Sequence, residues 1–359
     1  MSSLPPPAAR RWLPRRLLAT RSALTWDHGR AIAERAAGLG VEVVELPGDR
    51  LALGLPDDPR AAYAEAKRTL ALTVAPPSKR RLQPIAPSAD WRVDLAEGCP
   101  AHCSYCYLAG SLAGPPITRA YANLPEILAE LPAHLGQGRV TSRSRTRAAE
   151  GTTFEASCYT DPLALEHLTG SLAALIGHMG AWDADVQLRF TTKFADVEPL
   201  LGLAHRGKTR MRASINPPRF ARFEGGTAPV ATRLAALRRV ALAGYRVGLT
   251  IAPIIAAAGW ERAYGGLIAD AAEALGDLPD LDLTVELITH RFTPGSKAVL
   301  DRWYPGSALE MDPAARAEKR TKFGSVKHVY PPETMAALRR FFEREIAARL
   351  PAARILYWT

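Results

Sequence analysis

Three of the four cysteines in this 359-residue chain lie in one short segment, Gly98–Leu108, with the sequence GCPAHCSYCYL. Cys99, Cys103 and Cys106 have the spacing C-x3-C-x2-C. An iron–sulfur cube that only carries electrons is held by four thiolates. Three clustered thiolates would hold three irons and leave one open, as a catalytic metal keeps one coordination position free. We therefore predict that this segment, the cluster loop, binds a [4Fe-4S] cluster with an open iron.

Two other interpretations of these cysteines are weaker. Structural zinc sites favour paired C-x2-C knuckles, or one such pair with two histidines, and the chain has no second pair. His102 lies between two of the cysteines, where a further ligand would be crowded. Buried structural cysteines are the simplest alternative, but close spacing with Gly and Pro is more typical of a ligand loop.

The elements that must position the cluster loop alternate between strand and helix. From Trp91 onward the hydrophobic pattern predicts six strands. They are Trp91–Ala96, Thr153–Ser157, Val186–Thr192, Arg210–Ile215, Arg246–Ile254 and Leu283–Ile288. The helices predicted between them are Leu124–Leu131, Leu163–His178, Val230–Ala243 and Glu261–Leu275. This alternation favours an α/β fold, a partial (β/α)6 open TIM-like barrel whose first strand leads into the cluster loop.

Two domains are predicted. Residues 1–87 form a small N-terminal α/β layer, and residues 88–359 form the barrel with a C-terminal helix and cap. The predicted elements of the layer are helices at Asp27–Leu39 and Ala61–Leu72, a strand at Val41–Leu46 and a Pro-rich linker at Pro76–Asp90. Those of the tail are a helix at Pro332–Arg349 and a strand or cap at Arg354–Trp358.

Composition limits the classes of protein to which the chain can belong. A content of 47% hydrophobic and 23% charged residues is typical of globular proteins. No run of roughly eighteen apolar residues is present, so no membrane span is expected. Few cysteines in a long chain argue against a disulfide framework and favour a reducing compartment, the cytoplasm. The net charge of +10 suits a polyanion, and the runs Arg10–Arg16, Lys79–Arg81 and Arg143–Arg147 are candidate phosphate contacts.

The fourth cysteine, Cys158, ends the strand TTFEAS and opens the loop CYTDP. The C-terminal ends of barrel strands are where chemistry gathers in this architecture. A buried cysteine that packs as a small apolar residue is the structural alternative. Because an S–H bond is weak, a thiol at this position can give a hydrogen atom to a carbon radical.

The cysteine spacing, with an aromatic residue before the last cysteine, resembles that of radical S-adenosylmethionine enzymes. More narrowly, the chain resembles the spore photoproduct lyase family from about Trp26 to its end. The stretches that carry this resemblance, in order, are GCPAHCSYCYL, TTFEASCYTDP, HLTGSL, LRFTTKF, GKTRMRASIN, AGYRVGLTIAPI and ELITHRFT. It implies a DNA repair lyase that splits a methylene-bridged thymine dimer into two thymines through a 5′-deoxyadenosyl radical.

The resemblance also implies cofactors, partners and residue roles. The cofactors are a [4Fe-4S] cluster and S-adenosylmethionine, and the partners are damaged DNA and an external electron donor such as a flavodoxin or ferredoxin. Cys158 would give a hydrogen atom to the product radical. Tyr107 and then Tyr105 would quench the thiyl radical that results.

Four further residues resemble the cofactor contacts of the family. Lys193 in TTKF would meet the carboxylate of S-adenosylmethionine through a charge-assisted bond. Ser214 in RASIN and the backbone of Ala252 in IAPI resemble its other contacts. Thr160 stands where a serine is expected and keeps the hydroxyl group.

Two segments depart from the family pattern. Lys322–Tyr330, KFGSVKHVY, is shorter than the lesion-contacting stretch of the family and lacks its Arg-Tyr pair, so Lys327 or His328 would replace that contact. The arginine-rich segment Gly136–Gly151 resembles an insertion. Two alternative functions therefore stay open. One is a radical enzyme of this architecture acting on RNA, a nucleotide or a peptide, and the other is a non-catalytic nucleic-acid-binding protein with a structural cluster.

Overall fold

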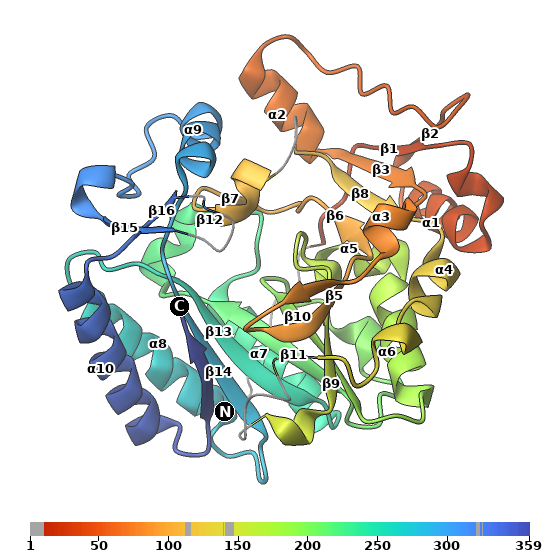
Figure 1. Cartoon of the computed structure of the whole chain (residues 1–359). Coiled ribbons are helices and arrows are strands. Elements are labelled where there is room, and N and C mark those ends of the chain that lie inside the picture. The colour runs from red at the N-terminus through yellow and green to blue at the C-terminus, as the bar shows by residue number, and fades with distance from the viewer. Residues whose placement is uncertain (1–10, 112–115, 139, 141–146, 321–323, 325) are drawn as a thin grey trace, which may run out of the picture.

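A curled eight-stranded sheet carries most of the fold (Figure 1), in the order β17-β14-β13-β11-β10-β9-β5-β4. Its strands are β4 (Gln83–Ile85), β5 (Ala89–Val93), β9 (Thr152–Ala156), β10 (Val186–Thr192), β11 (Thr209–Ile215), β13 (Arg246–Ile254), β14 (Leu283–Thr289) and β17 (Arg354–Trp358). All neighbouring pairs are parallel except β4 with β5. This computed structural model describes residues 11–111, 116–138, 140, 147–320, 324 and 326–359.

The predicted open barrel is confirmed. Six parallel strands, β5, β9, β10, β11, β13 and β14, curl without closing, and β4 and β17 extend the two edges. Strands such as β10 and β11 are buried along almost their whole length because helices cover one face and the barrel interior the other. The predicted bounds of β10, β13, β17 and the last helix match those observed.

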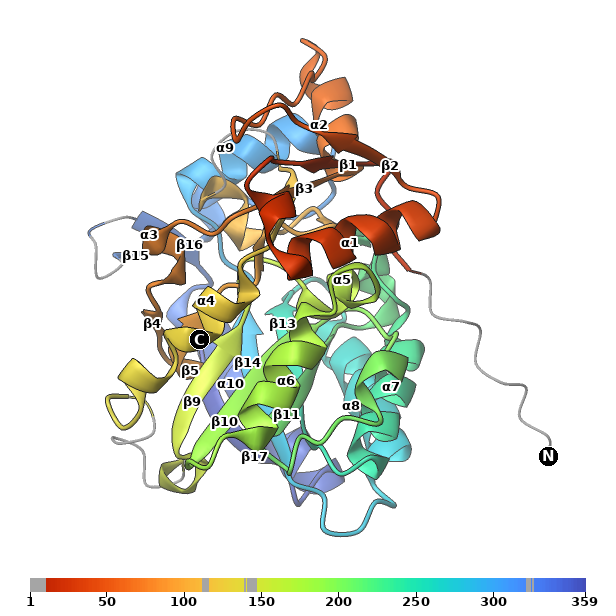
Figure 2. The same cartoon turned by 90° about the vertical axis from the view of Figure 1, so that its right-hand side faces the viewer.

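The helices mostly cover the outer face of this sheet (Figures 1 and 2). They are α4 (Leu124–Ala129), α5 (Pro162–Thr169), α6 (Ser171–Ala181), α7 (Val230–Leu242), α8 (Trp260–Leu275), α9 (Pro294–Trp303) and α10 (Pro332–Arg349). The single helix predicted at Leu163–His178 is wrong, because Gly170 has a left-handed φ of 63° that ends α5 before α6 begins. Within the described residues, no helix is both long and apolar enough to cross a bilayer.

A second sheet, β2-β1-β3-β8-β6, forms the N-terminal layer above the barrel strands (Figure 2). Its elements are β1 (Arg16–Ala19), α1 (Asp27–Gly38), β2 (Glu42–Glu45), α2 (Pro59–Lys67), β3 (Thr69–Thr73), β6 (Ala96–Glu97) and β8 (Thr118–Tyr121). The helix predicted at Ala61–Leu72 is wrong beyond Lys67, because the apolar run that follows is a buried strand paired with β1 and β8. Strands β6 and β8 follow residue 87, so this sheet draws on both sides of the predicted domain boundary, which stays a prediction.

The remaining elements are short. They are α3 (Pro77–Arg80), β7 (His102–Cys103), β12 (Glu224–Gly225), β15 (Ala317–Arg320) and β16 (Val326–Val329). The segment predicted as a linker, Pro76–Asp90, contains α3 and β4 and begins β5. It therefore packs as an edge of the barrel, because β4 pairs with β5 in antiparallel fashion.

Arginines and carboxylates fill part of the barrel interior. Arg189 on β10 and Arg212 on β11 have side chains no more than 1% exposed. Arg212 Nη1 donates to both carboxylate oxygens of Glu286 at 2.6 and 2.7 Å and also pairs with Glu155. Arg189 Nη2 donates to Glu150 Oε2 at 2.9 Å. Buried charges are tolerated only when they are paired in this way, so the network fixes strands to one another through the interior.

Glu286→Gln is expected to lower the free energy of unfolding by about 3 kcal/mol, because it leaves buried arginine charge uncompensated. Burial alone would raise the pKa of Glu286, but Arg212 and Arg189 hold it below its ordinary value. The contribution of the pair is therefore complete above the unfolded pKa of Glu and is lost as the pH falls through the lower folded pKa. Urea denaturation of the wild-type protein and of the Glu286→Gln variant, at neutral and at acid pH, measures this contribution to the free energy of unfolding.

The control is Glu343→Gln, which removes an exposed pair with Arg339 at 2.8 Å and should cost less than about 1 kcal/mol. An equal loss in the two variants, or a difference that does not shrink in acid, would contradict a stabilising ion network.

Candidate active site

One cavity of about 480 Å³ collects all the residues that the sequence assigned to chemistry. They are Cys99, Cys103, Tyr105, Cys106, Tyr107, Cys158, Thr160, Lys193, Ser214 and Ala252. The cavity lies at the C-terminal ends of the barrel strands, since Cys158 comes two residues after β9 and Lys193 directly after β10. The structure therefore brings together ten positions that are spread over more than 150 residues of sequence.

The cluster loop is held in place by contacts with three other segments of the chain. Gly98 has a φ of 71°, and a Cβ there would meet the carbonyl oxygen of Ile117 at 2.1 Å, so only glycine fits before Cys99. Lys67 Nζ donates to the carbonyl oxygens of Cys99 at 2.6 Å and Ala101 at 2.7 Å. Further along, Cys103 in β7 pairs with Glu224 in β12. These contacts fix the backbone that carries the three thiols.

The three loop thiols share an apolar environment. Burial raises the pKa of Cys99 to about 11 and that of Cys103 to about 12, against the opposing effects of Lys67 and Lys193 respectively. Among the described residues, no three His, Cys, Asp or Glu side chains converge on a point that would hold a single metal ion. An iron–sulfur cube spreads its thiolates over separate irons, so three free cysteines that line one cavity fit a cube better than a lone ion.

A buried carboxylate, that of Glu224, ties the loop to the rest of the site. Its Oε1 accepts from Lys193 Nζ at 2.9 Å and from the Tyr105 hydroxyl, and its Oε2 accepts from Arg233 Nη2 at 2.7 Å. Asn216 Nδ2 also donates to it, at 3.2 Å. Burial alone would raise the pKa of Glu224, but Lys193 and Arg233 bring it down to about 2. Sequence reasoning missed this residue because nothing marks the isolated glutamate in RFEGG.

Three of the four predicted cofactor contacts lie together. Lys193 Nζ donates to Ser214 Oγ at 2.8 Å and to the carbonyl oxygen of Ala252 at 3.1 Å. The third ammonium hydrogen of Lys193 is donated to Glu224. A cofactor carboxylate that binds Lys193 would therefore have to share a hydrogen with one of these three acceptors, or replace that acceptor. The fourth residue, Thr160, has a buried hydroxyl with no hydrogen-bond partner in the described part of the chain. A buried hydroxyl of this kind is one that a ligand could satisfy.

Asp161 positions Lys193 through its backbone. Its carboxylate accepts from the backbone N–H of Lys193 at 2.7 Å and from the Thr192 hydroxyl at 2.7 Å. It also caps α5 by accepting from the backbone N–H of Ala164 at 3.3 Å. The sequence signal for this role was the DP pair at the start of a helix, which is typical of an N-cap.

Cys158 carries its hydrogen at neutral pH, because burial raises its pKa to about 12 and Asp94 adds to the effect. Two charged residues that sequence reasoning missed, Arg92 and Asp94, lie beside this thiol. Arg92 donates from Nε to Asp94 Oδ2 at 2.8 Å, and its guanidinium lies 4.4 Å from the centre of the Tyr159 ring. Burial raises the pKa of Asp94 to about 6. The thiol therefore sits beside a buried ion pair, in a half-buried position at the edge of the cavity.

The two tyrosines of the cluster loop differ in their contacts. Tyr105 is 8% exposed, and its hydroxyl group is committed to Glu224. Tyr107 lies under the guanidinium of Arg291, which is 5.5 Å from the centre of its ring. Both line the cavity, so the arrangement is compatible with a path from Cys158 to either ring.

The basic runs are largely neutralised within the chain. Six of their cations, Arg11, Arg15, Arg16, Lys79, Arg80 and Arg147, form ion pairs with carboxylates. The predicted phosphate contact is wrong for Arg147, which is 3% exposed and donates to the carbonyl oxygens of Pro87 and Ser88. Arg10 and residues 143–146 lie outside the described residues, as do residues 139, 141 and 142 of the arginine-rich segment.

The departing segment Lys322–Tyr330 contributes β16, although Lys322 and its neighbours lie outside the described residues. His328 is buried, and its ring lies 5.0 Å from that of Phe292, so this side chain points into the fold. Lys327 is half-exposed on the other face of the strand. Of the two predicted replacements for the lesion contact, Lys327 is therefore the one accessible to a ligand.

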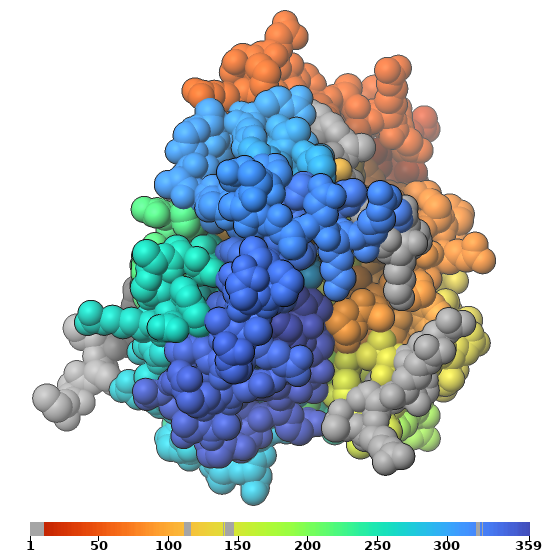
Figure 3. All heavy atoms as spheres, turned by 60° about the vertical axis from the view of Figure 1, so that its left-hand side comes forward, coloured from red at the N-terminus to blue at the C-terminus, as the bar shows by residue number. Residues whose placement is uncertain are grey.

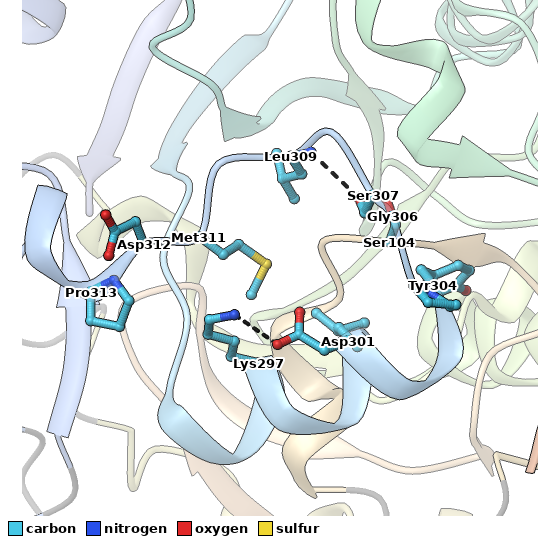
Figure 4. A pocket seen from close by; sticks show the side chains of 12 residues that line it. Ser104, Lys297, Asp301, Tyr304, Gly306, Ser307, Leu309, Met311, Asp312 and Pro313 are labelled. Atoms are coloured by element: carbon cyan, nitrogen blue, oxygen red, sulfur yellow. Dashed lines mark hydrogen bonds and ion pairs between the residues drawn. The ribbon is translucent and has the colours of Figure 1, made fainter.

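A second pocket, of about 460 Å³, lies between α9, the segment after it and Ser104 of the cluster loop (Figure 4). The ion pair between Lys297 and Asp301, at 2.7 Å, crosses its lining. Tyr304 lines both this pocket and the larger cavity. None of the ten predicted residues lines it, so the larger cavity is the candidate active site.

Comparisons with known proteins identify the family. A family model described as spore photoproduct lyase matches residues 12–359. Curated spore photoproduct lyases from Geobacillus sp. and Bacillus subtilis are 37% and 36% identical, each over 94% of this chain and 96% of the relative. The Clostridium acetobutylicum protein of that name is 30% identical over 96% of this chain and 98% of its own length.

Comparison with solved structures identifies the same family. A spore photoproduct lyase complexed with dinucleoside spore photoproduct has a TM-score of 0.89 and 36% identity, covering 98% of this chain and 100% of the other. A mutant with bound AdoMet and dinucleoside spore photoproduct matches equally well. With a family model that spans nearly its whole length and relatives at this level of identity, the chain belongs to the spore photoproduct lyase family.

Proposed function

We propose that this protein repairs DNA by splitting the spore photoproduct, a methylene-bridged thymine dimer, into two thymines by a radical mechanism. The observation that carries the proposal is that one cavity is lined by all ten residues that the resemblance to the family singles out. A [4Fe-4S] cluster with S-adenosylmethionine supplies a 5′-deoxyadenosyl radical, the hydrogen-abstracting agent. The work of the chain is to bind, to orient and to exclude water.

Two groups of cavity residues would bind the two cofactors. Cys99, Cys103 and Cys106 would hold the cluster, and Lys193, Ser214, Thr160 and the backbone of Ala252 would orient S-adenosylmethionine. Lys193 supports this assignment because its ammonium already points at Ser214 and Ala252. A related enzyme solved with bound AdoMet supports it as well.

Cys158 would supply the hydrogen atom that completes the product. Its raised pKa keeps the sulfur protonated, which is the form that can donate a hydrogen atom to a thymine radical. After that transfer the sulfur is a thiyl radical, and a phenolic hydrogen from Tyr107, followed by Tyr105, would restore the thiol. The lesion itself would enter from DNA, and an external donor such as a flavodoxin or ferredoxin would deliver the electron. Four unpaired cysteines fit a reducing compartment, for which we propose the cytoplasm.

Replacing Cys99, Cys103 or Cys106 by alanine should abolish cleavage of S-adenosylmethionine, because each thiolate holds one iron. Anaerobic reconstitution of the wild-type chain should give about four iron and four sulfide atoms per chain. The Cys158→Ala variant is the matched control and should keep the full iron content. Full cleavage activity in any variant of the cluster loop would overturn the cluster assignment.

Lys193→Met should weaken binding of S-adenosylmethionine by about tenfold to a hundredfold, the effect of losing one hydrogen bond to a charged group. Glu224 keeps Arg233, Tyr105 and Asn216 as partners, so the fold should survive. Equilibrium binding to the reconstituted protein gives the affinity, and iron content should not change. Lys297→Met, on α9, is the control. An unchanged affinity in Lys193→Met would refute the contact.

Cys158→Ala should still cleave S-adenosylmethionine when the lesion is present, because its hydrogen is needed only after the bridge has broken. The product radical would then persist and be trapped as adducts, and cofactor consumption per lesion should rise. Anaerobic turnover of a synthetic lesion, with products resolved by mass spectrometry, tests this. A structural cysteine would instead cost roughly 1–2 kcal/mol of stability and leave the product unchanged. Formation of thymine without adducts, at the wild-type ratio of cofactor consumed per lesion, would contradict the role of Cys158 as hydrogen donor.

A further inference from the structure

Lys67, the last residue of α2, is a buried cation without a carboxylate partner in the described part of the chain. Among the described residues, seven lysines and arginines are buried, and each of the other six forms an ion pair with Asp or Glu. Those six are Arg147, Arg189, Arg210, Arg212, Arg233 and Arg316. No Asp or Glu occurs among the residues outside the described part, so they cannot supply the missing partner.

The ammonium group of Lys67 faces the backbone of the cluster loop. Its Nζ donates to the carbonyl oxygens of Cys99 at 2.6 Å and of Ala101 at 2.7 Å. It also lies 5.8 Å from the centre of the Tyr63 ring, whose face attracts a cation. These neighbours offer only partial negative charge, whereas a buried full charge is costly unless an opposite charge balances it. Within the described part of the chain, one positive charge therefore stays uncompensated beside Cys99.

Aromatic side chains pack beside this charge, and Lys67 is only 6% exposed. Tyr63, on α2, packs against Trp303 and Tyr304 where α9 ends, with ring centres 4.9 and 5.6 Å apart. Its hydroxyl group is hydrogen-bonded to Tyr304 and, at 3.3 Å, to His102 Nδ1. Figure 3 shows the α9 region, in light blue, lying directly against the orange part of the chain that contains α2. A charge enclosed in this way is weakly screened, so its field is stronger than that of an exposed charge.

The place of this charge indicates which anion it would meet. Lys67 lines the same cavity as the three cysteines of the cluster loop. Negative charge gathers on these thiols once they bind iron, because metal binding removes their protons. An iron–sulfur cube held by three thiolates is anionic when oxidised, and reduction adds one further negative charge. The cluster therefore fits the unpaired ammonium in sign and in position, and its reduced form fits better than its oxidised form.

The carboxylate of S-adenosylmethionine is the other anion proposed for this cavity. Its expected partner is Lys193, which follows β10 and lies with Ser214 and Ala252. Lys67 enters from α2 instead, and its hydrogen bonds are to the backbone of the cluster loop. The two lysines thus approach the cavity from different segments, which favours different anions for them.

We propose that Lys67 is the electrostatic partner of the iron–sulfur cluster: its positive charge stabilises the reduced cluster and raises its reduction potential. The inference rests on the proposed function, because it takes the cluster assignment as given, and it adds a residue of the N-terminal layer to the site. Net charge around a cluster is one of the means by which a protein sets its potential. One electron from the external donor reduces the cluster, and Lys67 makes that transfer more favourable without gaining or losing a proton.

The test is a redox titration of anaerobically reconstituted protein, with the reduced cluster measured by electron paramagnetic resonance. Lys67→Gln removes the charge but keeps an amide group whose N–H can donate to a carbonyl oxygen. At the midpoint potential of the wild type, the ratio of reduced to oxidised cluster in this variant should be at least about tenfold lower. For a one-electron couple, this ratio corresponds to a midpoint potential about 59 mV more negative.

Two further variants separate the effect of charge from that of shape. Lys67→Arg keeps the positive charge, so its midpoint potential should stay closer to that of the wild type than the potential of Lys67→Gln does. The matched control is Lys208→Gln, since Lys208 Nζ also donates to two backbone carbonyl oxygens, those of Trp182 and Ala184. Lys208 directly precedes β11, at the opposite end of the barrel from the cavity, so its loss should leave the potential unchanged. Iron content and affinity for S-adenosylmethionine are measured in every variant.

An unchanged midpoint potential in Lys67→Gln with full iron content would overturn the inference. So would an equal shift in Lys67→Arg or in Lys208→Gln, or a loss of S-adenosylmethionine affinity without a shift in potential. If Lys67→Gln does not hold the cluster, Lys67→Arg decides: retention of the cluster supports the need for a charge, and its loss overturns the inference. A wild-type protein that binds no cluster would count against the proposed function instead, so the two failures are distinguishable.

Discussion

A single buried carboxylate, that of Glu224, joins parts of the chain that are far apart in the sequence. Through it the cluster loop, the end of β10 and the helix α7 meet, because Tyr105, Lys193 and Arg233 all donate to its two oxygens. The carboxylate stays ionised in a buried place only because two cations surround it. In turn it holds the lysine near Ser214 and Ala252, the other predicted cofactor contacts.

Charge has two distinct uses in this fold. In the barrel interior, arginines such as Arg189 and Arg212 are matched with carboxylates and act as structure. At the mouth of the cavity, Arg291 and Lys327 have no such match among the described residues. The net charge of +10 therefore says little about where a polyanion binds, because much of the positive charge is neutralised within the molecule.

The outline of the fold was predictable because its signals are local. Short segments in which apolar residues alternate with polar ones indicated the parallel strands, and helical periodicity indicated α7, α8 and α10. The errors arose where a local pattern had two solutions. The run after Lys67 continues the apolar pattern of α2, but it pairs as β3 because two neighbouring strands are available to it. Gly170 divides one predicted helix because its left-handed conformation is needed for the turn.

The sequence by itself determined the candidate site residues, since the three loop cysteines lie within eight positions and the resemblance to the family supplies the other seven. Spacing of that kind is local, and a loop conformation follows from it. The tertiary structure alone decided which partners those residues have. Glu224 at β12, Arg92 and Asp94 beside Cys158, and the burial of Arg147 follow from contacts between segments far apart in the chain. Such contacts are set by strand register and packing, which leave no mark at any single position of the sequence.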